Sequence, residues 1–243
     1  MTTISADVLA KLKTFDTPTI CNVIEHFDVR PRNVGFMDKS IKAAYPEMPP
    51  VVGFAATFTL RTAFDPQLEG GAYSGTEDQV ESFAQLSGPP VVVFQDLDSP
   101  PLGATFGEMM CSTYQGFGAV GLITNGPGRD MEQVRDLGFP VFTDGVVCSH
   151  SYVRMFDILV PVHVGGMAIF PDDLIHADLN GVATIPKDIA AEVADAGDEL
   201  VAAEKVVLDA VKQPGVTVAQ LRAARAEYSN LAAKLHARVS RKK

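Results

Sequence analysis

The stretch from Gly118 to Asp130, GAVGLITNGPGRD, joins a compact apolar run, a glycine–proline turn and an Arg-Asp pair. Residues 119–124 have the pattern of a strand that is buried on both faces, as strands of parallel sheets are. The turn at 125–128 ends this strand, and Arg129 and Asp130 follow it directly. In open α/β sheets, ligands bind at the carboxyl ends of the strands. The stretch therefore predicts an α/β fold and the place of a site.

Further apolar runs and helical segments occur on both sides of this stretch. Apolar runs predict buried strands at 51–60, 90–96 and 140–143, and they alternate with helical segments near 76–86, 107–115 and 131–137. From residue 159 the pattern becomes all-β, with short segments at 161–164, 167–170, 174–178 and 182–185. Asn180-Gly181 between two of them predicts a hairpin. Alternating strands and helices followed by a run of strands predict one α/β domain.

Helical patterns occupy both ends of the chain. Residues 4–28 have helical spacing that Pro18 interrupts, and Thr17 is the expected N-cap. Two more helices are predicted after residue 186, separated by Pro214-Gly215 and with the second at 218–238. We therefore divide the chain into an N-terminal helical arm and loop (1–50), a core (51–186) and a C-terminal helical arm (187–243).

Composition and charge exclude several classes of protein. The 243 residues are 47% hydrophobic and 21% charged, with a formal net charge of −10, which is typical of a folded globular chain. Residues 43–186 contain four arginines, no lysine and seventeen acids, so this segment would repel nucleic acid. We expect no nucleic-acid or membrane partner. No signal-like or membrane-spanning stretch is present, and we expect a cytoplasmic protein.

Familiar catalytic motifs are missing from the sequence. It has no G-x-G-x-x-G after a strand, no Walker A lysine and no G-x-S-x-G. Only Lys187 is placed to form an imine, so a lysine Schiff base is disfavoured. The five histidines show no metal-binding spacing. The three cysteines, Cys21, Cys111 and Cys148, form no C-x-x-C pair and favour buried free thiols.

The remaining candidates are acids and one arginine. Arg129 could grip a carboxylate with two hydrogen bonds, and Asp130 could hold a hard divalent cation. Gly107-Glu108 stands where a loop becomes a helix, whose free N–H groups bind anions. Glu108 could serve a metal or act as a base. Simpler alternatives stay open, because Arg129 and Asp130 could form a surface ion pair and Glu108 could merely complement the helix dipole.

Taken together, these motifs resemble a known family. An acid at 108, a gap of twenty residues and then Arg129-Asp130 is similar to the pattern of the RraA-like family. That family includes 4-hydroxy-4-methyl-2-oxoglutarate aldolases and a regulator of RNase E. The resemblance covers roughly residues 15–207, and further matching segments are 104–108, 118–130, 139–142, 161–166, 171–174 and 178–182.

The resemblance implies a β/β/α fold of the swivelling-domain type, assembled as homotrimers or homohexamers with active sites between subunits. It implies a class II pyruvate aldolase that cleaves a small 2-oxo acid through an enolate, with oxaloacetate decarboxylation as a side activity. Arg129 would hold the pyruvyl carboxylate. Asp130 and Glu108 would position Mg²⁺, Mn²⁺ or another divalent metal. Substrate would also contact Gly107 and the backbone N–H groups of Met109 and Met110.

Other positions are transferred from the resemblance less directly. Glu204 aligns with an acid that a neighbouring subunit lends to the metal site. His150 and Tyr152 lie in a Ser-His-Ser-Tyr segment outside the aldolase pattern. They could contact the distal part of a different substrate, or the segment could be structural. Asn125 stands where many members carry aspartate.

Two other functions remain to be weighed. The first is a non-catalytic binding protein like the RNase E regulator, which lacks the acid that corresponds to Glu108. The second is a menaquinone methyltransferase, which the absence of a methyl-donor fingerprint disfavours. The natural substrate beyond its pyruvyl half, the choice between trimer and hexamer, and the effect of glutamate rather than aspartate at 108 stay open.

Overall fold

The fold is built around one mixed sheet. The computed structural model describes residues 4–242 except 66, 68 and 73, and in this part of the chain eight strands join in the order β1-β5-β4-β3-β2-β9-β10, with β6 also paired to β2. These strands are β1 (Lys42–Ala43), β2 (Val51–Arg61), β3 (Pro90–Asp96), β4 (Gly121–Thr124), β5 (Val141–Thr143), β6 (Arg154–Ile158), β9 (Leu174–Asp178) and β10 (Gly181–Ile185). A separate hairpin pairs β7 (Val162–Val164) with β8 (Met167–Ile169).

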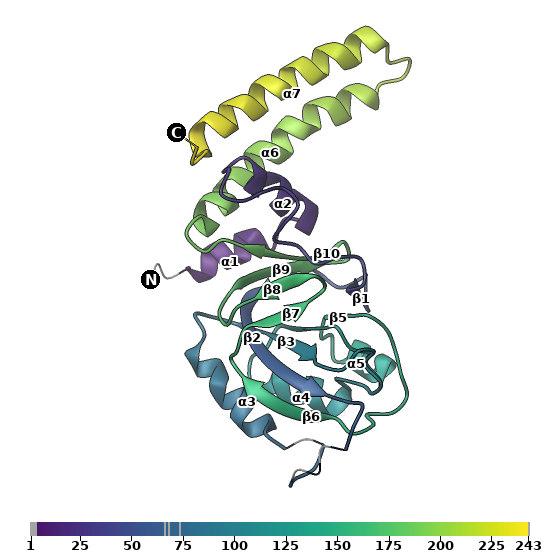
Figure 1. Cartoon of the computed structure of the whole chain (residues 1–243). Helices are drawn as coiled ribbons and strands as arrows, with labels where there is room; N and C mark the ends of the chain where they lie inside the picture. Colours follow the sequence, from purple (N-terminus) through teal and green to yellow (C-terminus); the bar gives the residue numbers. More distant parts are fainter. Residues whose placement is uncertain (1–3, 66, 68, 73, 243) are drawn as a thin grey trace.

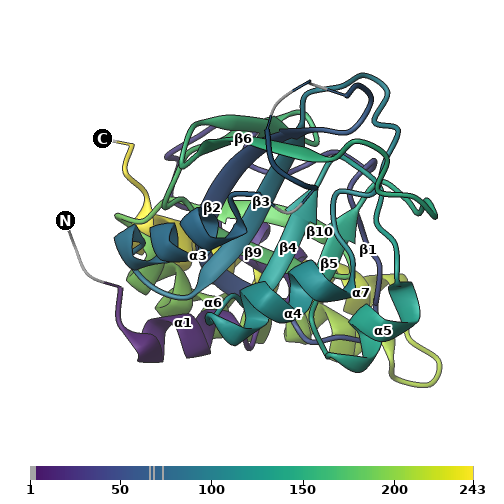
Figure 2. The same ribbon diagram turned by 90° about the horizontal axis from the view of Figure 1, so that it is seen from below.

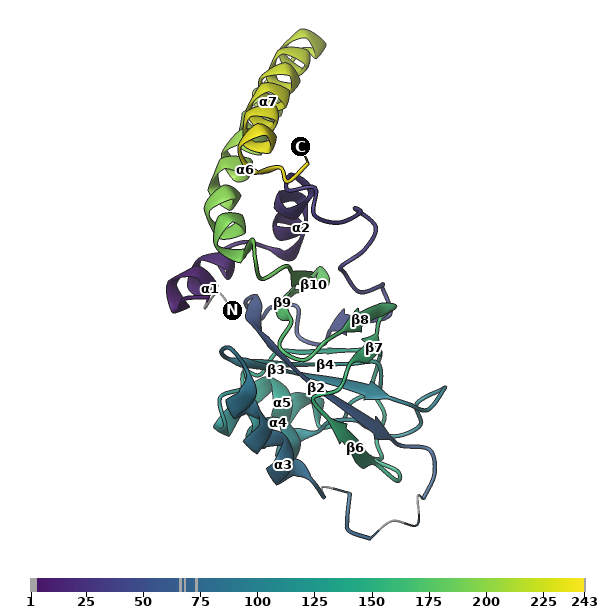
Figure 3. The ribbon, with the colours of Figure 1, turned by 60° about the vertical axis from the view of Figure 1, so that its left-hand side comes forward.

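Helices flank the sheet at one face and at one end (Figure 1, Figure 2). They are α1 (Ala6–Leu12), α2 (Thr17–Glu25), α3 (Thr76–Ser82), α4 (Glu108–Gly116), α5 (Met131–Asp136), α6 (Ala190–Val211) and α7 (Val218–Val239), with a 3-10 turn at Phe83–Gln85. Helices α3, α4 and α5 lie on the same face of the sheet, and α1 and α2 lie beside the first half of α6 (Figure 3).

Strands β2 to β5 run parallel to one another, as the buried apolar runs predict. Pairing of β2 with β3, β3 with β4 and β4 with β5 is parallel. Every residue of β4 and β5 is buried, as are ten of the eleven residues of β2. The carboxyl ends of these strands therefore meet at one edge, where Asp96 ends β3 and Thr62, Asn125 and Asp144 follow β2, β4 and β5.

The sheet separates two apolar clusters. One lies under α3, α4 and α5 and includes Phe58, Phe94, Phe106 and Tyr114, all fully or almost fully buried. The other, on the opposite face, includes side chains of the β7–β8 hairpin. Burying aromatic side chains of this size stabilises a fold by about 1.5–3 kcal/mol each. The helices on one face and the small hairpin on the other thus hold the parallel strands rigidly.

The two ends of the chain pack against each other. Helices α1, α2 and α6 share a third apolar cluster that includes Leu12, Ile20 and Leu200. Gly197 lets α6 approach the segment between α1 and α2, because a Cβ there would lie 2.5 Å from the Phe15 ring. Beyond this cluster, α6 and α7 form a hairpin that projects away from the sheet (Figure 1). Its second helix begins at a capping box formed by Thr217 and Gln220.

Some local predictions need correction. The predicted interruption of the helical segment 4–28 is confirmed, since α1 and α2 are separate helices, but the N-cap of the second is Asp16, whose carboxylate accepts a hydrogen bond from the Thr19 N–H, rather than Thr17. Two strands were not predicted. β1 has only two residues, and β6 is half-exposed along its length, so neither presents a buried apolar run. The Asn180-Gly181 hairpin is confirmed between β9 and β10.

Candidate functional site

The ends of β3 and β4 are joined by one side chain. Oδ1 of Asn125 accepts a hydrogen bond from the Asp96 N–H at 2.7 Å, and Nδ2 donates to the Asp96 carbonyl at 2.9 Å. An aspartate could not supply the second bond, because its ionised carboxylate only accepts. Asn125 therefore fixes the point at which the turn toward Arg129 leaves the sheet.

Glycine allows the turn to pack tightly against its neighbours. A Cβ on Gly128 would lie 1.9 Å from the Phe106 ring, so the ring covers this residue directly. The Gly128 N–H donates to the Gly145 carbonyl at 3.0 Å, and the Arg129 N–H donates to the Phe106 carbonyl at 3.1 Å. The turn is thus held between the segment before α4 and the segment after β5.

Asp130 occupies a special backbone conformation. Its φ of 56° and ψ of 43° lie in the left-handed region, which non-glycine residues adopt at an energetic cost. This conformation directs the carboxylate toward α4, where Oδ2 accepts a hydrogen bond from the Glu108 N–H at 3.2 Å. The Arg129 Nε lies 3.7 Å from the same oxygen. The structure therefore brings together three residues that the sequence singled out.

Gly107 makes this approach possible. A Cβ at this position would lie 2.6 Å from Oδ2 of Asp130 and 3.3 Å from the Cγ of Arg129. The φ of Gly107 is −161°, an extended conformation open to any residue. The requirement for glycine here is therefore one of space alone, and it arises from the two side chains of the Arg-Asp pair.

The chemistry of the donors suits a hard cation that keeps most of its water. The side chains of Arg129 and Asp130 are 27% and 38% exposed, and Glu108 is exposed at the first turn of α4. No group of three or more His, Cys, Asp or Glu side chains that could hold a metal occurs in the described ranges 4–65, 67, 69–72 and 74–242. Mg²⁺ is commonly bound through one or two carboxylates with water in its remaining positions. The Asp130 and Glu108 carboxylates fit that pattern.

Met109 and Met110 continue the first turn of α4. Met109 is 56% exposed, whereas Met110 is almost fully buried. Their N–H groups belong to the free amino end of the helix, where anions are stabilised. The predicted contact of a substrate with these N–H groups stays a prediction.

Glu204 lies on the projecting hairpin. It lines a groove of about 450 Å³ between α6 and α7, together with Arg225 and Tyr228. Figure 1 shows this part of the hairpin at the opposite end of the molecule from α4 and α5. Within one chain, Glu204 is therefore separate from Asp130, and a role at the metal site requires a second chain.

His150 and Tyr152 line a different cavity of about 210 Å³. Its other described lining residues are Asp65, Gly70, Gly71, Ala72, Ser151, Val153 and Arg154, and the set contains none of Gly107, Glu108 and Asp130. The segment is nevertheless tied to the loop before α4, because the Ala104 N–H donates to the Ser149 carbonyl at 2.8 Å. A contact of His150 or Tyr152 with substrate stays a prediction.

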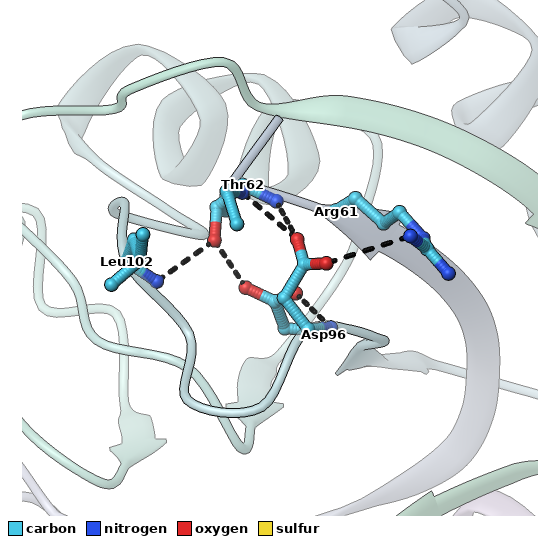
Figure 4. A network of polar contacts seen from close by, with 6 residues as sticks. Arg61, Thr62, Asp96 and Leu102 are labelled. Carbon is cyan, nitrogen blue, oxygen red and sulfur yellow. Dashed lines mark hydrogen bonds and ion pairs between the residues drawn. The ribbon is translucent and has the colours of Figure 1, made fainter. Parts of the chain in front are cut away.

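A polar network at the ends of β2 and β3 was not singled out from the sequence (Figure 4). The Thr62 hydroxyl donates to Asp96 at 2.6 Å, and both Thr62 and Ala63 donate their N–H groups to Asp98. Burial raises the pKa of Asp96, although the Thr62 hydroxyl opposes this shift. Asp96 is the last residue of a buried strand, at the same edge of the sheet as the turn that follows β4, and that position was the available signal.

Comparison with known proteins gives one family. A sequence model of the RraA-like family, described as Aldolase/RraA, matches residues 17–184. A stretch of 100 residues is 31% identical to a protein of Halalkalibacterium halodurans named "Putative 4-hydroxy-4-methyl-2-oxoglutarate aldolase", and a stretch of 90 residues is 32% identical to protein DlpA of Legionella pneumophila. These matches cover 41% and 36% of this chain, but only 48% and 15% of the two relatives.

Solved structures support the fold alone. An uncharacterized protein from Pseudomonas syringae superposes with a TM-score of 0.70 at 22% identity, over 93% of this chain and 95% of that one. Streptomyces coelicolor RraAS2, titled an unusual member of the RNase ES inhibitor RraA protein family, gives 0.67 at 20% identity, over 84% and 97%. The predicted α/β fold with C-terminal helices is confirmed. In the part of the chain that the structure describes, none of the helices combines the length and the apolar character needed to cross a membrane.

Proposed function

We propose that this chain, which belongs to the RraA-like family, is a divalent-metal-dependent lyase that cleaves or decarboxylates a small 2-oxo acid. One observation carries the proposal. The Asp130 carboxylate, the Arg129 guanidinium and the amino end of α4 lie together at the carboxyl edge of the parallel strands. This is the edge at which open α/β sheets bind their ligands.

Each residue of the proposed site has a task, and Glu108 has two. Arg129 binds the carboxylate of the pyruvyl unit, because a guanidinium matches a carboxylate with two parallel hydrogen bonds. Asp130 and Glu108 would hold the divalent cation. When bound, the cation would supply a positive charge beside the 2-oxo group and would stabilise the negative charge that the broken C–C bond leaves on the pyruvyl unit. The N–H groups of Met109 and Met110 add positive potential on the same side of the substrate.

Retro-aldol cleavage and decarboxylation share this arrangement. In both reactions the electron pair of the broken C–C bond moves into the pyruvyl unit, and a proton is later added at its C3. Retro-aldol cleavage also needs a base for the proton of the 4-hydroxyl group. Glu108 is exposed at the mouth of the site and could take that proton directly or through water.

A non-catalytic regulatory binding protein is the second candidate, because the same fold also occurs in RraAS2. The combination of Glu108, Arg129 and Asp130 favours the enzyme, since a docking protein has no need of a metal-binding set beside a carboxylate-binding arginine.

The test is pyruvate release from oxaloacetate and from 4-hydroxy-4-methyl-2-oxoglutarate, with Mg²⁺ and then with EDTA. We expect metal-dependent turnover that falls by at least about 10²-fold in Arg129→Ala and Asp130→Ala. Matched controls are Arg135→Ala and Asp136→Ala, which change exposed residues of α5 and should keep full activity. Absence of turnover together with absence of Mg²⁺ binding in the folded protein would replace the lyase by the regulatory protein.

A further inference from the structure

A further hollow lies beside the first turn of α4, the helix whose amino end borders the candidate site. It is a groove of about 340 Å³ between α3 and α4, lined by Thr76, Glu77, Val80, Met109, Met110, Thr113 and Phe117. The Glu108 N–H, one residue before Met109, donates to Asp130. Met109, which lines the groove, therefore follows directly along the chain the residue whose N–H bonds to Asp130, while the lining itself contains neither Glu108 nor Asp130.

The fold fixes the length of the groove and holds together the two helices that form it. From Met109 to Phe117 the α4 side spans eight residues, or about 12 Å along a helix. The Tyr114 hydroxyl donates to Oε1 of Gln79 at 2.6 Å, and both side chains are buried, so this bond ties α3 to α4. Figures 2 and 3 show the two helices on the same face of the sheet. The hollow is a built feature of this layer.

The lining of the groove selects against a charged occupant. Val80, Met109, Met110 and Phe117 are apolar, and Met109 and Phe117 are 56% and 62% exposed. Among the described residues that line it, Glu77 alone carries a charge, and this charge is negative. A second carboxylate in this groove would meet no lysine or arginine and would lie near an acid. An alkyl chain would cover exposed apolar surface instead.

We infer that the α3–α4 groove receives the distal half of the substrate, and that the substrate is a 4-hydroxy-2-oxo acid whose chain beyond C4 is apolar. This inference rests on the proposed function, because Arg129 and the metal site anchor the pyruvyl half. Methionine suits such a role, since its unbranched side chain adapts to chains of different shape.

Calorimetric titration of straight-chain 2-oxo acids in the presence of Mg²⁺ tests the inference without turnover. The probes are pyruvate, 2-oxohexanoate, 2-oxooctanoate and 2-oxoadipate. We expect affinity to rise about two- to fourfold for each added methylene, because buried CH₂ groups contribute up to about 0.8 kcal/mol. 2-Oxohexanoate should bind at least about tenfold tighter than 2-oxoadipate, which differs only by its terminal carboxylate.

Variants place the chain in the groove. Thr113→Phe and Val80→Phe fill it from opposite walls and should abolish the gain with chain length while leaving pyruvate affinity unchanged. Ser112→Phe is the matched control, because Ser112 is exposed on the same helix and does not line the groove. Tyr152→Ala, in the separate 210 Å³ cavity, should also keep the gain.

The possible failures are distinguishable. If pyruvate binds and requires Arg129 but longer chains gain nothing, the inference is wrong and the proposed function stands. A gain that is lost in Tyr152→Ala rather than in Thr113→Phe would place the chain in the other cavity. If Thr113→Phe changes the mass of the assembly instead of acid affinity, the groove is a contact between copies. If no acid binds, both proposals fail together.

Discussion

The Arg129–Asp130 turn is packed against other residues of its own chain, whereas the outer half of the α6–α7 hairpin leaves apolar side chains exposed. The turn is enclosed by Gly107, Phe106 and Gly145, and each backbone contact is made within the chain. The hairpin beyond residue 204 has exposed apolar side chains, including Leu208 and Val211. One chain thus explains the conformation of the turn, whereas the role of the hairpin depends on what lies beside it.

The largest effect is expected where the turn is most crowded. Gly107→Ala places a methyl group 2.6 Å from Oδ2 of Asp130 and must displace the Arg-Asp pair. We expect a loss of about 10²-fold in kcat/KM for oxaloacetate, as a misplacement near 1 Å produces. The melting temperature should change little, because the backbone conformation is open to alanine.

Gly116→Ala is the matched control for this variant. Gly116 ends the same helix, and a Cβ there meets nothing within 4 Å. Equal losses in the two variants would contradict the claim that Gly107 serves the Asp130 carboxylate.

The buried contacts of His176 in β9 with α1 and α2 are, like the Arg129–Asp130 turn, made entirely by residues of one chain. Their contribution to stability should therefore be measurable on the single chain. His176 is fully buried, its Nδ1 lies 2.9 Å from the Thr17 hydroxyl, and its Nε2 lies 3.2 Å from the Leu12 carbonyl. Burial lowers its pKa below the usual 6.5. A lowered pKa in the folded state means that stability is fully present above pH 6.5 and is lost as the pH falls through the folded-state pKa.

Urea unfolding at pH 7.5 and pH 5.5 measures this loss. His176→Asn should lower the free energy of unfolding by about 1–3 kcal/mol at pH 7.5, since buried hydrogen bonds are removed. It should also reduce the difference between the two pH values. His163→Asn, on the exposed face of β7, is the control and should leave both quantities unchanged. An undiminished pH difference in His176→Asn would exclude His176 as its source.

The outer hairpin should show its role only in an assembly. If a neighbouring subunit lends Glu204, then Glu204→Gln lowers kcat/KM by about tenfold, as loss of a group supporting a metal does. Mixing it with Arg129→Ala during refolding should then restore activity, because some sites receive both native residues. Asp209→Asn, which breaks an exposed pair with Lys205 on the same helix, is the control. A mixture no more active than its parts would remove Glu204 from the site.

The sequence predicted what local chemistry determines. Buried runs such as 90–96 became strands because parallel strands between two covered layers must be apolar along their whole length. The proximity of Glu108 and Asp130 could be predicted from the sequence, since loops after parallel strands meet at one edge of the sheet. β6 escaped prediction because RMFDI is half-exposed and lacks a clear alternation. It becomes a strand through its pairing with β2, which is a long-range contact.

Part of the site could also be predicted from local features of the sequence. Gly107 and Gly128 lie in segments that the sequence singled out, and the structure supplies their close neighbours, Asp130 and Phe106. The Thr62–Asp96–Asp98 network was missed, because it joins residues from two strand ends and has no motif in either segment. The predicted role of Glu204 depends on a second chain, since α6, which contains it, projects with α7 away from α4 (Figure 1).

Asp130, held against the amino end of α4, is the residue on which the proposed divalent-metal site depends. Water-proton relaxation during a Mn²⁺ titration tests it directly, with the wild type, Asp130→Asn and the exposed control Asp136→Asn. We expect one Mn²⁺ per chain, at least about tenfold weaker binding in Asp130→Asn, and a change in relaxation when pyruvate is added. Equal Mn²⁺ affinity in all three proteins, or none in the wild type, would contradict this expectation.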